Sequence, residues 1–182
     1  HVLSCHGRGT SSFGNVRALT LAGNSIGDYG VRSLVGAPTV CASLTALDVR
    51  DARIMTLTWL DELLDVARCL SSLDASHLGT RPHTREWTMP QRPHESLCFL
   101  GLRDCLLDAE WADDFRTRGA PNLPGLRVLD LRSNPSLLRY APDFSRALFP
   151  DRGTTGGRGG GTASSRVAST STSAVVVYHD RE

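Results

Sequence analysis

The chain has 182 residues, a length that allows one domain of ordinary size together with a tail. Its formal net charge is only +1, so the composition gives no reason to expect a nucleic-acid or membrane-surface partner. All 20 cationic residues are Arg, which we attribute to coding bias, and no run approaches the roughly 18 apolar residues of a membrane-spanning helix.

Residues 1–15 are polar, rich in Gly and Ser, and show no periodicity. We expect a loose start, or the remnant of a repeat that precedes those described next. The chain begins with His and opens directly on a bare repeat, whereas repeat arrays usually need capping units. We therefore expect a fragment of a longer protein.

From residue 16 onward one frame returns five times, with apolar residues at its first, fourth and sixth places. The frames begin at Val16, Leu44, Leu70, Leu97 and Leu126. A fixed period of this size predicts one supersecondary unit stacked on copies of itself. Alternation within each frame predicts a short strand, whose leucines enter a core while the intervening side chains face the other way.

The frames resemble the leucine-rich repeats, and the segments after them resemble the ribonuclease-inhibitor-like subfamily. LTLAGNSIGDYGVRSL (19–34) is similar to the family pattern L-x-L-x-x-N-x-I-x-x-x-G-x-x-x-L. The ninth place of a frame holds Asn24 or Asn134, or Cys105 as in the family's alternative form, but Ala52 and Leu78 depart from it. An Asn there is expected to satisfy backbone groups of the turning chain.

The resemblance covers residues 16–149 and implies an α/β fold. It implies a leucine-rich-repeat solenoid, a short horseshoe arc of about five strand–helix units with a parallel sheet on the concave face. For activity it implies little, because such repeats serve many partners.

Helices are predicted between the frames. Residues 27–35 have helical spacing of apolar residues, and Pro38 should prevent continuation. Residues 55–70 carry the clearest amphipathic pattern. Residues 106–119 place three large apolar side chains at four-residue steps, which indicates core packing, and 136–149 predict a short or broken helix because Pro142 interrupts them.

The third unit lacks this pattern. Residues 79–96 contain three prolines and no apolar period, so we expect an irregular loop in place of a helix. Such a loop can determine specificity or can be a tolerated insertion. After Pro150, residues 150–182 form a Gly/Ser/Thr-rich tail that we expect to be disordered, except that 174–179 either add an edge strand or remain exposed.

Outward strand places at equal positions should form rows across the sheet. One row contains Thr20, Asp48, Asp74, Gly101 and Asp130, and the next contains Ala22, Arg50, Ser76, Arg103 and Arg132. The two charged rows either pair with each other on a hydrated face or form a protein-docking strip with Phe99. The candidate protein-binding residues are Asp48, Arg50, Asp74, Ser76, Phe99, Arg103, Asp130 and Arg132.

Catalysis and cofactors are not expected. His77 lies near Asp74 and Ser76, but these three share one extended segment that supplies no oxyanion hole. A zinc site from Cys98 and Cys105 with His77, His83 or His94 lacks the usual C-x2-C spacing. The five scattered cysteines are expected to be free thiols, which suits a reducing compartment.

The sequence thus predicts a non-enzymatic protein-binding module, part of a larger intracellular scaffold or regulatory protein. We expect a monomeric module in the cytoplasm, with another protein as partner and neither nucleic acid nor membrane bound. The resemblance leaves two alternatives open. Some ribonuclease-inhibitor-like arrays are GTPase activators, which implies a regulator that uses Arg81, Arg85 or Arg92. The interruption HTREWTMPQRP (83–93) resembles centrosomal and basal-body leucine-rich-repeat proteins, which implies a cytoskeletal component.

Overall fold

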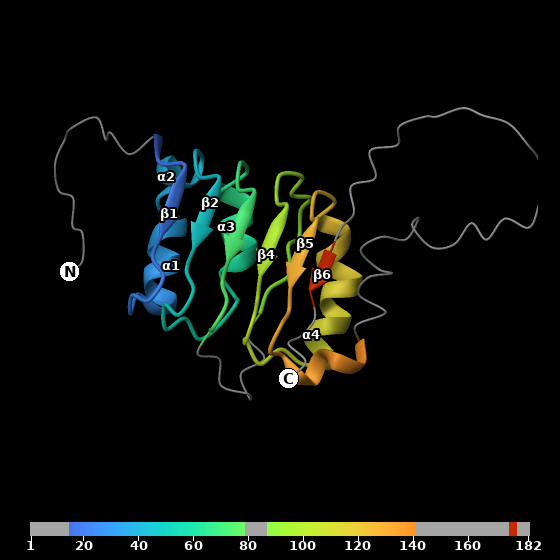
Figure 1. Cartoon of the computed structure of the whole chain (residues 1–182). Helices are drawn as coiled ribbons and strands as arrows, with labels where there is room; N and C mark the ends of the chain where they lie inside the picture. The colour runs from blue at the N-terminus through green and yellow to red at the C-terminus, as the bar shows by residue number, and fades with distance from the viewer. Residues whose placement is uncertain (1–14, 79–86, 141–174, 178–182) are drawn as a thin grey trace, which may run out of the picture.

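The computed structural model describes residues 15–78, 87–140 and 175–177. They form an α/β fold with one parallel sheet, in which the order of strands follows the order of the chain (Figure 1). This confirms the predicted α/β class and the parallel sheet. The six short strands of the described residues are β1 (Ala18–Thr20), β2 (Ala46–Asp48), β3 (Ser72–Asp74), β4 (Phe99–Gly101), β5 (Val128–Asp130) and β6 (Val175–Val177).

The first five strands lie at the same place in their frames. Each pairs in register with the next, so that Leu19, Leu47, Leu73, Leu100 and Leu129 form one row across the sheet. Four of these five leucines are buried, and the leucine of β1, at the edge of the sheet, is half-buried. The row is the apolar spine that the periodicity predicts.

The helices lie on one side of the sheet (Figure 1). α1 (Gly27–Val35) has the predicted bounds. Pro38 ends that helix but starts the short helix α2 (Pro38–Cys41), because proline is tolerated at a first helical position. α4 (Ala109–Asp114) continues as a π-helical turn (Phe115–Gly119) and a 3-10 turn (Ala120–Asn122), and a further 3-10 segment follows β5 (Pro135–Tyr140).

α3 (Leu60–Val66) is shorter than the helix predicted over 55–70. Its expected first turn is held in a loop by the carboxylate of Asp28, which accepts hydrogen bonds from the backbone N–H groups of Met55 and Thr56 at 3.0 Å. The indole of Trp59 also donates to the carbonyl of Thr56 at 2.7 Å. The contacts from Asp28, which lies outside the segment, override its helical pattern.

The core fills the space between the sheet and the helices. Its largest fully buried side chains include Trp59, Trp111 and Phe115. The rings of Trp111 and Phe115 stack with centroids 4.9 Å apart, as the four-residue spacing in 106–119 indicates. These aromatic residues therefore stabilise the fold from within.

Residues 87–96 contain no helix, as predicted for the described part of the 79–96 loop. They nevertheless pack closely: Met89 is 2% exposed and His94 is 1% exposed. Hydrogen bonds join the loop to both neighbouring helices. The backbone N–H of Gln91 donates to the carboxylate of Asp61 in α3, and the indole N–H of Trp87 donates to the carboxylate of Asp114 in α4. This segment takes the place of a helix in the outer layer.

The remaining predictions concern the ends of the chain. Residues 175–177 form β6, which pairs with β5. Of the two alternatives for 174–179, the structure therefore has the edge strand. Residues 1–14 of the expected loose start, residues 141–149 of the predicted last helix and the other tail residues lie outside the described residues. None of the helices in the described ranges has the length and apolar character needed to cross a membrane.

Candidate functional site

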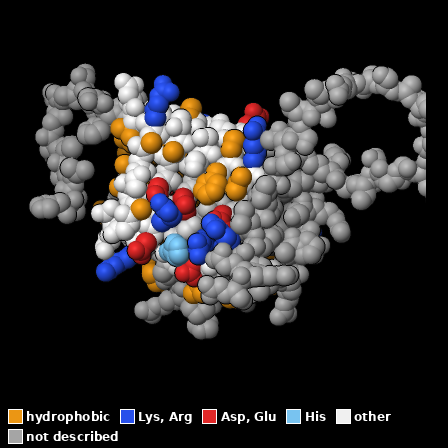
Figure 2. Space-filling view, in the orientation of Figure 1, with side chains coloured by type: hydrophobic (Ala, Val, Ile, Leu, Met, Phe, Trp, Pro, Cys, Tyr) orange, Lys and Arg blue, Asp and Glu red, His pale blue; other side chains and the backbone are white. Residues whose placement is uncertain are grey.

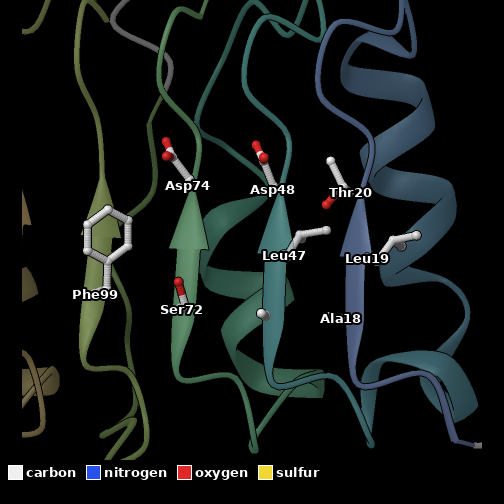
Figure 3. Close-up of a pocket in the computed structure, with 9 residues that line it drawn as sticks. Ala18, Leu19, Thr20, Leu47, Asp48, Ser72, Asp74 and Phe99 are labelled. Carbon is white, nitrogen blue, oxygen red and sulfur yellow. The ribbon is translucent and has the colours of Figure 1, made fainter.

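The candidate site lies on the face of the sheet opposite the helices (Figure 2). The first residues of β1 to β5 pair in register and form one row across this face: Ala18, Ala46, Ser72, Phe99 and Val128. Small side chains on the first three strands thus give way to a large ring on β4. The result is a shallow pocket of about 220 Å³ over β1 to β4, with the ring of Phe99 at one end (Figure 3).

The acidic row borders this pocket. Thr20, Asp48, Asp74, Gly101 and Asp130 pair in sequence across the five strands, as predicted. Asp48 and Asp74 line the pocket together with Thr20 (Figure 3). The depression therefore combines a floor of small side chains, an aromatic end and a carboxylate edge.

Arg50 forms an ion pair with the carboxylate of Asp48. Its guanidinium donates to both oxygens of Asp48, at 2.9 and 2.8 Å, and lies 3.5 Å from Asp74 through Nε. The hydrogen bonds from Arg50 lower the pKa of Asp48 despite partial burial. Asp48 is thus tightly paired, whereas Asp74 has a longer and weaker ion contact.

Asp130 and Arg132 form a second bidentate pair. Arg132 donates through Nε to Oδ1 at 2.9 Å and through Nη2 to Oδ2 at 2.7 Å. Burial tends to raise the pKa of Asp130, but the hydrogen bonds from Arg132 and the nearby charge of Arg103 lower it overall. The two rows therefore pair with each other at Asp48–Arg50 and at Asp130–Arg132, the two places in the rows where an acid stands two residues before an arginine.

Ser76 differs from the other candidate docking residues. Its side chain was predicted to face outward, but it is 3% exposed, and its hydroxyl accepts a hydrogen bond from the backbone N–H of Arg103 at 3.1 Å. The chain is already turning away from the sheet here, so this hydroxyl links adjacent units and does not line an accessible surface. Phe99 and Arg103 are half-buried, and Arg50 remains exposed.

The catalytic arrangement considered for His77 is not formed. His77 has a positive φ of 57° and its Nδ1 lies 3.2 Å from a carboxylate oxygen of Asp104, whereas Asp74 accepts from the backbone N–H of Ser76. The left-handed backbone at His77 redirects its ring away from the row of strand side chains.

The candidate zinc ligands are also separated by their partners. The Cys105 thiol donates to the carbonyls of Ala75 and Arg103, and burial raises its pKa to about 12. His94 uses both ring nitrogens, one to the carbonyl of Ala67 and one to the backbone N–H of Leu97. Among the residues with described positions, no three His, Cys, Asp or Glu side chains are grouped for a metal, and His83 lies outside them.

Gly101 lies in the acidic row as predicted, but its effect on the neighbouring side chains is not predicted by the sequence. It stands in the acidic row without a side chain, and a Cβ placed there would lie 2.6 Å from Oδ1 of Asp74 and 3.2 Å from Cε1 of Phe99. The missing side chain lets these two groups approach each other across β4. The break in the row was visible in the sequence as the single glycine among its five members.

Comparison with protein-family models, with curated proteins and with solved structures gives no match to this chain. Its function has to be inferred from the geometry of this sheet face.

Proposed function

We propose that the chain is a leucine-rich-repeat solenoid of the ribonuclease-inhibitor-like type and acts as a non-enzymatic protein-binding module. The fold proposal is supported by the regular placement of strands: each of the five frames contributes one strand at the same place, in register with its neighbour. One unit could not bury its apolar face alone, so the stacking of units provides the core.

The ninth place of the frames adds support. The amide of Asn134 donates to three backbone carbonyls, those of Leu102, Leu131 and Arg132, and its oxygen accepts from two backbone N–H groups. Cys105 stands at the same place one unit earlier and donates to the carbonyl of Ala75, also in the preceding unit. The two side chains thus serve equivalent inter-unit contacts, as the family's two alternative forms imply.

The observation that carries the binding proposal is the composition of the open sheet face. An aromatic ring, a shallow pocket and ordered rows of both charges lie on strands that are fixed by the core behind them (Figures 2 and 3). Complementary charge rows favour a specific partner and a fast encounter, and a rigid scaffold lowers the entropy cost of binding. Hence we propose the strand face, including Asp48, Arg50, Phe99, Arg103 and Arg132, as the docking surface.

Site-specific photo-cross-linking tests this surface. A photoreactive residue would replace Thr20, which is exposed on the sheet face, or Tyr29, which is 80% exposed on α1 and serves as the control. The protein would be irradiated in cells and its adducts identified. We expect a defined adduct from position 20 that is lost in a triple Arg50/Arg103/Arg132→Ala variant, and adducts arising only from position 29 would contradict the proposal.

The loop at 79–96 could also take part in binding, but deleting it would damage the fold, because Met89 and His94 are buried. The GTPase-activating alternative depends on loop arginines. Arg92 is exposed and lies 3.6 Å from Asp65, and the other two lie outside the described residues. A purified chain that accelerates hydrolysis by no small GTPase would remove this alternative. Finding the tagged protein in cells away from centrosomes and basal bodies would remove the cytoskeletal one.

A further inference from the structure

The described part of the sheet ends at β1, which has β2 on one side only (Figure 1). The carbonyl of Arg17 and the N–H of Leu21 form backbone hydrogen bonds with β2. Successive residues of a strand direct their backbone groups to opposite sides, so those of Ala18 and Thr20 point away from β2. Among the described residues no strand pairs with that side of β1, which is therefore an open edge.

The apolar residues of the first frame are incompletely covered at this edge. Val16, Leu19 and Leu21 are half-buried, whereas the residues at the same three places in the other four frames are all 4% exposed or less. A strand paired with the open side of β1 would remove more of this apolar surface from water, which favours its binding.

Asn24 indicates what kind of segment fits this edge. Its amide donates to two carbonyls of its own frame, as the amide of Asn134 does at the same place of the last frame. Asn134 also bonds to the unit before it: its amide donates to the carbonyl of Leu102, and its oxygen accepts from the backbone N–H groups of Cys105 and Leu107, both at 3.0 Å. No described residue donates to the side-chain oxygen of Asn24, which is exposed. Asn24 thus has the bonds within its own frame and lacks those that a neighbouring segment supplies.

The segment that Asn134 binds shows which backbone geometry supplies those bonds. It consists of β4 and the turn that follows, in which Asp104 and Leu106 have positive φ angles of 51°. The two donating N–H groups belong to the residues directly after these left-handed residues. A parallel strand followed by such a turn would satisfy Asn24 in the same way.

We propose that the open edge of β1 binds an extended segment of another protein, which pairs as a parallel strand and then turns to donate two N–H groups to Asn24. The segment carries an apolar residue opposite Leu19, as β6 places Val176 opposite Leu129 at the other end of the sheet. Gly, Asn or Asp is favoured at the fourth and sixth positions after that residue, because these residues adopt positive φ most readily. The edge is distinct from the proposed docking surface, so binding at one does not require binding at the other.

A peptide with the sequence of residues 96–108 serves as the probe, because it contains β4 and the turn that Asn134 binds. The fluorescein-labelled peptide would be titrated with the full chain under reducing conditions, and binding would be followed by fluorescence anisotropy. We expect saturable binding that weakens about tenfold or more in Asn24→Ala, which removes the acceptor. Thr20→Pro should weaken it at least as much, because it removes an N–H of the open edge while leaving the hydrogen bonds with β2 in place.

N-methylation of the peptide at the residue equivalent to Cys105 isolates one hydrogen bond to Asn24. It should weaken binding to the unaltered chain by about threefold to tenfold and have little further effect on binding to Asn24→Ala. The matched control is Ser25→Ala, which changes the adjacent exposed residue and should leave affinity unchanged.

Absence of saturable binding would overturn the inference, as would binding that neither Asn24→Ala nor Thr20→Pro weakens. An equal effect of N-methylation on the unaltered chain and on Asn24→Ala would overturn the hydrogen bond assigned to Asn24. Binding that is lost in the Arg50/Arg103/Arg132→Ala variant but kept in Thr20→Pro would place the peptide on the docking surface. That result would overturn the edge proposal and leave the proposed function standing.

Discussion

The carboxylate of Asp74 occupies the space that a side chain at position 101 of β4 would fill. A Cβ at Gly101 would lie 2.6 Å from Oδ1 of Asp74, closer than such atoms approach in folded proteins. The two residues are register partners on adjacent strands. Their relationship determines the position of the carboxylate next to Phe99, and so it determines the shape and charge of the pocket.

A charged residue at position 101 should therefore disturb this face. In Gly101→Asp the new carboxylate would lie directly opposite Asp74, and like charges at opposed positions of a sheet are destabilising. We expect the variant to lose about 1–2 kcal/mol of unfolding free energy relative to Gly101→Asn, which has nearly the same shape. Urea denaturation near neutral pH measures this difference.

Acidification supplies the check on that cause. Protonation of the introduced carboxylate should relieve the repulsion as the pH falls toward about 4. The gap between the Asp and Asn variants should then shrink. A gap that stays constant with pH would mean that crowding, and not charge, explains the loss.

The backbone plan could be predicted from the sequence because it depends on a repeated local pattern. Leu47, Leu73 and Leu100 lie in one row since their frames have the same length up to the strand. The relation between Asp74 and Gly101 could not be predicted in the same way. Both positions in the row were predicted, but the direction of a side chain on the surface depends on its neighbours on other strands.

Asn134 should contribute strongly to stability. Its side chain is 3% exposed and satisfies backbone groups of two neighbouring units. Asn134→Ala would leave several buried groups without partners, at roughly 1–3 kcal/mol for each group that water cannot reach. We expect a total loss of about 3–4 kcal/mol by urea denaturation.

Asn24→Ala is the matched control for that change. Asn24 has the same place in the first frame, but it is exposed and donates only to the nearby carbonyls of Leu21 and Ala22. Its removal should cost no more than about 1 kcal/mol. Equal losses in the two variants would show that the inter-unit contacts of Asn134 do not stabilise the fold.

Asp130 should make stability depend on pH. Its pKa is lowered in the folded chain, so its ion pair contributes fully above the ordinary Asp pKa of about 3.9 and is lost as the pH falls through the lower folded value. Asp130→Asn removes this contribution. We expect the variant to be about 1–2 kcal/mol less stable near neutral pH, with the deficit disappearing at about pH 2.

The same titration with Asp113→Asn provides the comparison, because Asp113 is exposed on α4 and its contact with Arg116 at 3.2 Å is open to solvent. The difference from the unaltered chain should stay small at every pH. A deficit of Asp130→Asn that persists at low pH would indicate lost packing in place of a lost ion pair.

Predictions for the helical layer were less accurate than those for the sheet. The amphipathic stripe of 55–70 is real, since Leu60, Leu63 and Leu64 are buried, but the first turn gives way to hydrogen bonds from Asp28. That carboxylate belongs to the preceding unit, 27 residues earlier. Such a contact between units cannot be inferred from the pattern of either segment alone.

The loop at 87–96 yields the last prediction, which separates a structural segment from a tolerated insertion. His94 is buried, and its ring bridges the carbonyl of Ala67 after α3 and the backbone N–H of Leu97 before β4. His94→Ala removes both of these hydrogen bonds at once and opens a cavity. We expect a loss of about 2–4 kcal/mol in unfolding free energy, measured by urea denaturation. Glu95→Ala changes the adjacent exposed residue and should alter stability by less than about 0.5 kcal/mol, so similar stability of the two variants would restore the view that this loop is a dispensable insertion.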